Sequence, residues 1–182
     1  MMSYDKMKWF MVTHQAGHWF MVGLTFPVLS LFILAKGLDY AGLGLVMAIY
    51  SGSVVVAELP SGVLSDIIGR KRIYIVSLVL SVAGAAVALL SSGFWGLAAG
   101  FCLLGLARAF ASGSAEALFI DELYRLRPGE DIRPALAAQG IAVPLSLGAA
   151  SLLGGALPGM VSASSCGAGN PYAANVAAYL AL

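Results

Sequence analysis

Long apolar segments dominate the sequence and restrict the folds that it can adopt. They cover residues 9–35, 40–61, 73–90, 95–120 and 136–157, and a further segment begins at residue 172 and runs to residue 182. A helix needs about 20 apolar residues to cross the hydrocarbon core of a bilayer. The segments show no strand-like alternation of polar and apolar residues. The sequence therefore predicts membrane-spanning helices.

The composition supports this interpretation. Hydrophobic residues make up 60% of the chain and charged residues only 10%, whereas a soluble domain carries about 25% charged residues. A soluble fold of this length cannot bury so much apolar surface. In lipid, the backbone polar groups must be satisfied within the chain, which leaves helices or closed barrels, and the segment lengths favour helices. We expect an all-α, polytopic membrane protein with a single transmembrane bundle over residues 1–182.

The distribution of cations predicts the orientation of the bundle. Two charged connections, residues 62–72 and 122–135, separate the second span from the third and the fourth from the fifth. If successive spans alternate in direction, both connections and the N-terminus lie on the same side. That side holds eight of the ten lysines and arginines, and the opposite side holds only Lys36. Because cations favour the cytoplasmic side, we expect a retained first span with a cytoplasmic N-terminus.

The first of these connections has a specific order of glycines and charges. It reads "GVLSDIIGRKR" over residues 62–72. Its candidate functional residues are Gly62, Leu64, Asp66, Gly69, Arg70 and Lys71. The glycines permit close approach and a tight reversal. Asp66 and Arg70 are four residues apart and can pair if the segment is helical. The cations at the membrane edge attract anionic lipid.

The pattern G-x-L-x-D-x-x-G-R-K-R resembles the signature loop of the major facilitator superfamily, which joins the second and third transmembrane helices. The preceding "ELP" and "LARAFASGSAEALFIDEL" in the fourth span are also similar to members of this superfamily. The resemblance implies the N-terminal six-helix half of a transporter, with a sixth helix left incomplete at residue 182. It also implies that Asp66, Arg70 and Asp121 form a gate that closes the cytoplasmic face against the second half. The alternative is that the segment 62–72 has no gating role and only sets the orientation of the helices in the membrane.

Arg108 lies near the middle of the fourth span. A cation at that depth costs about 3 kcal/mol or more, so it must face a partner or a wet cavity. Superfamily members that exchange drugs for protons carry an arginine in this helix, in a pattern close to R-x-x-Q-G. Here the glutamine is absent and Gly113 comes one place late. Arg108 is therefore either a substrate or proton-coupling residue or a structural arginine paired within the bundle.

Other polar residues near the span ends are candidates for proton coupling. Glu58 and Glu116 lie close to the predicted cytoplasmic ends of the second and fourth spans, as proton carriers or as partners of a nearby cation. His14 and His18 share one helix face, but no third ligand is evident, so the sequence predicts no metal site. A proton role for His18 and a place in the lining of a cavity remain alternatives.

The sequence predicts secondary active transport of a small solute by alternating access, proton-coupled, as efflux (an antiporter) or uptake. We expect it in a bacterial inner membrane, with membrane lipid, an unidentified solute and a missing C-terminal half or second copy as partners. The alternative is a non-transporting fragment or half-bundle that functions only after assembly with a second half or another membrane protein. The sequence contains no nucleotide-phosphate loop, nucleophile elbow or metalloprotease helix. We therefore expect no enzymatic activity, no cofactor and no nucleic-acid partner.

Overall fold

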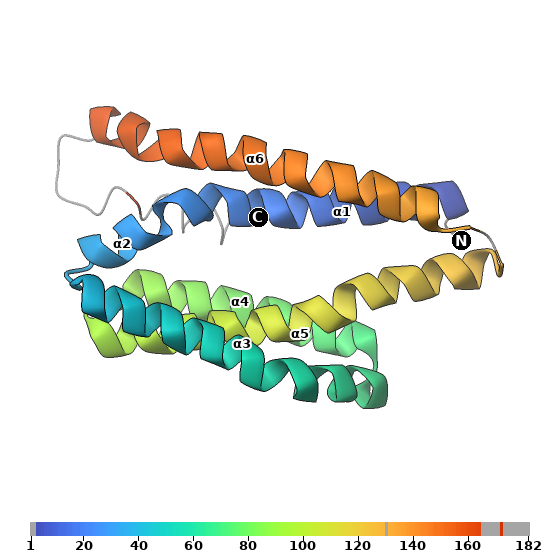
Figure 1. Ribbon diagram of the computed structural model, residues 1–182, viewed down its shortest axis with the longest axis horizontal. Coiled ribbons are helices and arrows are strands. Elements are labelled where there is room, and N and C mark those ends of the chain that lie inside the picture. Colours follow the sequence, from blue (N-terminus) through green and yellow to red (C-terminus); the bar gives the residue numbers. More distant parts are fainter. Residues whose placement is uncertain (1–2, 130, 165–171, 173–182) are drawn as a thin grey trace. The chain divides into compact units, whose positions relative to one another are not determined.

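The computed structural model describes residues 3–129, 131–164 and 172, and every regular element in these ranges is helical (Figure 1). The elements are α1 (Tyr4–Thr25), the short 3₁₀ helix η1 (Phe26–Val28), α2 (Leu29–Ala35), α3 (Tyr40–Ile68), α4 (Arg70–Leu90), α5 (Phe94–Leu126) and α6 (Arg133–Ser164). Within these ranges five helices, counting α1 to α2 as one, are long and apolar enough to cross a membrane. The predicted all-helical membrane fold is confirmed for the described residues.

Two helices begin at side-chain caps that the sequence supplies. The Ser3 hydroxyl accepts a hydrogen bond from the Lys6 N–H at 3.4 Å at the start of α1. The Asp39 carboxylate accepts one from the Gly42 N–H at 2.8 Å at the start of α3. Each cap satisfies one of the N–H groups that the first helical turn leaves without an intrahelical acceptor.

The first predicted span, residues 9–35, is not one regular helix. Pro27 lies in η1, which separates α1 from α2. Proline has no N–H to donate and its ring clashes with the preceding turn, so a break at this point is expected. Other prolines, such as Pro60 in α3, lie within helices that continue past them.

The connections are shorter than the sequence predicts. Residues 62–68 complete α3 and α4 begins at Arg70, so only Gly69 of the predicted loop 62–72 lies outside a helix. Likewise α5 continues to Leu126 and α6 begins at Arg133, which shortens the predicted connection 122–135. The predicted loops are too long because charged residues end an apolar segment but do not end the helix. The predicted sixth span, residues 172–182, lies outside the described residues apart from Tyr172, which is in a turn.

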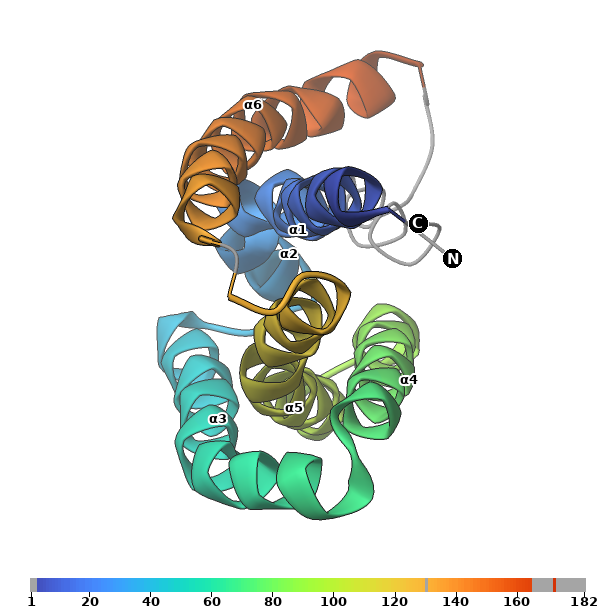
Figure 2. The same cartoon turned by 90° about the vertical axis from the view of Figure 1, so that its right-hand side faces the viewer.

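The chain separates into two compact units. The first contains α1, η1 and α6, together with the end of α5 from Phe119. Within it, α1 and α6 lie side by side (Figures 1 and 2). Its core holds Met11, Phe119, Leu123 and Ala135, and partly buried hydrophobic residues pack around this core.

The second unit covers Ser30–Leu118, and in it α5 lies between α3 and α4 (Figure 2). Glycines allow the close approach of these helices, as small residues do in membrane bundles. A Cβ atom at Gly84 of α4 would lie 2.9 Å from the Gly100 carbonyl oxygen of α5. By contrast, Gly44 and Gly52 of α3 have nothing within 4 Å of such an atom. Side chains at these two positions would therefore enter open space within the described chain.

Large apolar side chains remain exposed along α3 and α4. On α3, Leu59 is 84% exposed and Ile67 is 76% exposed, and Val79 on α4 is 62% exposed. Exposed apolar surface of this extent is unfavourable in water and is expected where a helix faces lipid or another membrane segment.

Candidate functional site

The charged segment 62–72 places its two halves on different helices, with Gly69 as the joint. Gly69 has a φ angle of 103°, which glycine adopts without the steric penalty of a Cβ atom. Its N–H donates to the Ser65 carbonyl at 3.1 Å and so ends α3, while its own carbonyl accepts the Arg72 N–H at 3.1 Å and starts α4. The reversal that the sequence predicts for this glycine is therefore confined to a single residue.

Asp66 and Arg70 face each other across this joint. The Arg70 Nη2 atom lies 3.7 Å from the Asp66 Oδ1 atom. This distance is longer than the roughly 2.7–2.9 Å that is usual for a charge-assisted hydrogen bond, so the contact is a weak ion pair. The Asp66 side chain is 71% exposed and that of Arg70 is 31% exposed.

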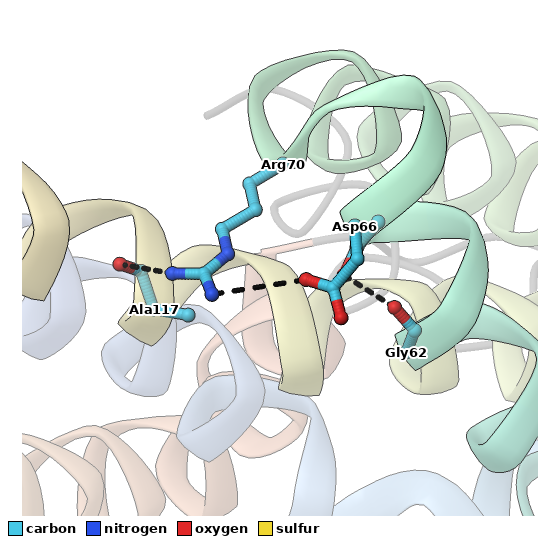
Figure 3. A network of polar contacts seen from close by, with 5 residues as sticks. Gly62, Asp66, Arg70 and Ala117 are labelled. Carbon is cyan, nitrogen blue, oxygen red and sulfur yellow. Dashed lines mark hydrogen bonds and ion pairs between the residues drawn. The ribbon is translucent and has the colours of Figure 1, made fainter.

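Arg70 also joins α4 to α5. Its Nη1 atom donates a hydrogen bond to the Ala117 carbonyl oxygen at 3.0 Å. Figure 3 shows the guanidinium group between the Asp66 carboxylate on one side and the Ala117 carbonyl on the other. The guanidinium is therefore anchored on a helix backbone while the carboxylate stays accessible from outside the unit.

Another polar contact joins α3 to α5. The buried Ser61 hydroxyl lies 2.9 Å from the Ala109 carbonyl of α5 and 2.9 Å from the Glu58 carbonyl of its own helix. Arg108 precedes Ala109, so the contact brings the backbones of Glu58 and Arg108 to the same level of the two helices. Both side chains are exposed.

The other predicted site residues are more scattered. Glu116 and Lys71 are exposed, and Leu64 is half-buried. Gly62 lies within α3, and a Cβ atom at this position would have nothing within 4 Å. It therefore makes no close approach inside the described chain.

Two further candidates lie in the first unit. Asp121 is exposed on the part of α5 that belongs to that unit. His18 is half-buried and its ring packs edge-to-face on Trp19, with 6.0 Å between ring centroids. No group of three metal-ligating side chains occurs in the part of the chain that the structure describes.

Sequence reasoning did not predict the contacts of Lys36. Its ammonium group donates hydrogen bonds to the carbonyls of Leu89 at 2.5 Å and Ser91 at 2.9 Å, and lies 5.4 Å from the centre of the Phe32 ring. These carbonyls lie at the C-terminal end of α4, where the helix dipole favours a cation. The isolated position of Lys36 between two apolar segments was the only signal in the sequence.

Comparison with known proteins identifies the family. The sequence profile described as Major Facilitator Superfamily matches residues 14–180. The chain is 31% identical over 132 residues to the inner membrane transport protein YajR of Escherichia coli (strain K12). This alignment covers 72% of the chain and 28% of the length of YajR, and no solved structure matches the chain. The chain is an integral membrane protein and belongs to the major facilitator superfamily.

Proposed function

We propose that the chain is the N-terminal half of a secondary active transporter that moves a small solute across a bacterial inner membrane by alternating access. In such carriers the two halves rock about a central site. The E. coli relative is an inner membrane transport protein, which supports both the transport function and the location. The proposal places the N-terminus and the Gly69 joint on the cytoplasmic side, because the cations concentrate there.

The contact of Arg70 with Asp66 and Ala117 carries this proposal. A gate must open and close repeatedly, so its contacts must be weak enough to exchange. An exposed ion pair contributes about 0–1 kcal/mol, and the 3.7 Å separation and exposed carboxylate fit that range. Asp66 is thus able to exchange Arg70 for a partner on the second half of the carrier, while Arg70 keeps its hydrogen bond to α5.

The proposed coupling residues are Arg108, Glu58, Glu116 and His18. Arg108 and Glu58 are the best supported of these, because the hydrogen bond between Ser61 and Ala109 sets them at one level of adjacent helices. A proton moving on or off Glu58 would change the field at Arg108 and so the affinity for a charged or polar solute. This arrangement supports proton coupling for efflux or uptake.

The gate is tested by cysteine accessibility in the assembled carrier. Asp66→Asn should shift the labelling of cysteines placed on the cytoplasmic face, because the carboxylate that exchanges partners is lost. Asp131→Asn is the matched control, since Asp131 forms an exposed pair with Arg133 at the same distance of 3.7 Å. If the two variants label identically, the Asp66–Arg70 segment is a topology signal rather than a gate.

Coupling is tested in vesicles that contain a pH-sensitive dye and are exposed in turn to sugars, amino acids and organic cations. Arg108→Ala should abolish the solute-dependent pH change at normal protein yield. An unchanged signal would remove Arg108 from the site.

A half-bundle that is inactive until assembled is the second candidate. The open face of α3 at Gly44 and Gly52 supports it, because small residues on one face commonly pack against another helix. The same vesicles, prepared with the chain alone and with a co-expressed second half, test whether the chain needs assembly. Transport by the chain alone would exclude this second candidate.

A further inference from the structure

Contacts along the seam between α1 and α6 fix the register of the two helices. Met11 of α1 and Ala135 of α6 belong to one core. Further along, the Ser146 hydroxyl donates to the Ala16 carbonyl at 2.7 Å, and Gly154 lies against the backbone of Leu24. Residue numbers rise together along both helices, so α1 and α6 run in parallel.

Polar side chains also lie along this seam. His14 follows Met11 by three residues and Gln139 follows Ala135 by four, so each lies one helical turn beyond the core contact and on the same helix face as its predecessor. The His14 ring packs 5.2 Å from the Phe119 ring, measured between centroids. His14 and Gln139 both lie between this core and the Ser146 contact along their own helices.

The side-chain amide oxygen of Gln139 lacks a hydrogen-bond donor in the described part of this seam. This Oε1 atom is buried and accepts no hydrogen bond from any described residue. The core residues on the adjoining turn, Met11, Phe119 and Ala135, carry no side-chain donor. A buried amide oxygen without a donor is unfavourable, and more so within a bilayer, where bulk water is absent.

We propose that Gln139 binds a water molecule in the seam between α1 and α6, one turn beyond Ala135. Water suits the site because it is small and can donate a hydrogen bond to the buried amide oxygen. This inference concerns hydration and is independent of the transport function proposed above.

The sequence makes a direct test practical, because Gln15 and Gln139 are its only glutamines. The full chain is labelled with carbon-13 at the glutamine side-chain carbonyl and the aspartate carboxylate, and is placed in lipid bilayers for solid-state NMR. Gln139→Met assigns the two glutamine signals. We expect transfer of magnetisation from water protons to the Gln139 carbonyl, with the exposed carboxylate of Asp131 as the positive control.

A stability measurement complements the spectrum. Methionine matches glutamine in length and is likewise unbranched at Cβ and Cγ, so Gln139→Met removes the hydrogen-bonding group with little change in packing. If water satisfies the amide oxygen, the midpoint of thermal unfolding should fall by about 2–6 °C. A midpoint that stays level or rises, or an absence of transfer from water to the Gln139 carbonyl, would overturn the proposal.

Discussion

Replacing Gly69 with alanine should destabilise the chain, because the joint between α3 and α4 depends on the backbone freedom of glycine. Gly69 has φ 103° and ψ 132°, a conformation that L-residues rarely adopt. Holding a residue in such a region costs about 1–3 kcal/mol. A Cβ atom at Gly69 would have nothing within 4 Å, so this backbone term accounts for the whole effect. For a chain of this size, we expect the unfolding midpoint to fall by about 2–12 °C.

The measurement is thermal unfolding of the detergent-solubilised chain, followed by circular dichroism of the helices. Gly62→Ala is the matched control, because Gly62 lies in the same segment, is helical and also has open space beside it. Alanine is the better helix former by about 0.5–1 kcal/mol, so this variant should be slightly more stable than the parent chain. A Gly69→Ala chain as stable as Gly62→Ala would refute the assignment of the joint to positive φ.

Three further predictions concern other contacts. Gly154→Ala should lower the unfolding midpoint and cost about 1–3 kcal/mol of stability, because the alanine Cβ would lie 2.8 Å from the Leu24 Cα. The control Gly155→Ala should not lower the midpoint, since a Cβ there would have nothing within 4 Å. Lys36→Met should speed hydrogen exchange in the last turn of α4, since two hydrogen bonds to its carbonyls are lost; unchanged rates would contradict this role. Asp39→Ala should cost about 1 kcal/mol through loss of the α3 cap, measured by the same unfolding assay, and no loss would contradict the cap.

The sequence predicts the helices well because lipid imposes a simple rule. A segment must be apolar over the thickness of the bilayer, and hydropathy reports this directly. It predicts the helix ends poorly for the same reason. A charged residue such as Asp66 ends an apolar segment but continues the helix, and the end is set instead by the φ angle of Gly69. Pro27 carried a signal for a break in the first span, but the apolar pattern runs through it.

The site could be predicted only in part. The spacing of Asp66 and Arg70 follows from helix periodicity, and the structure shows them in contact. The bond from Arg70 to Ala117 could not be predicted, because its acceptor is a backbone carbonyl 47 residues away. Backbone acceptors carry no side-chain signature, and the same reason hides the contacts of Lys36. The buried oxygen of Gln139 becomes visible only when the register of α1 and α6 is known.

A connector of one residue has little capacity to absorb changes in length. Only two soft dihedral angles separate the last residue of α3 from the first of α4, so the direction of α4 is fixed by the conformation of Gly69 and its flanking turns. One extra residue within the first turn of α4 would rotate everything before it by about 100° around the helix axis. The guanidinium would then point away from α5, and so this part of the chain tolerates substitutions far better than insertions or deletions.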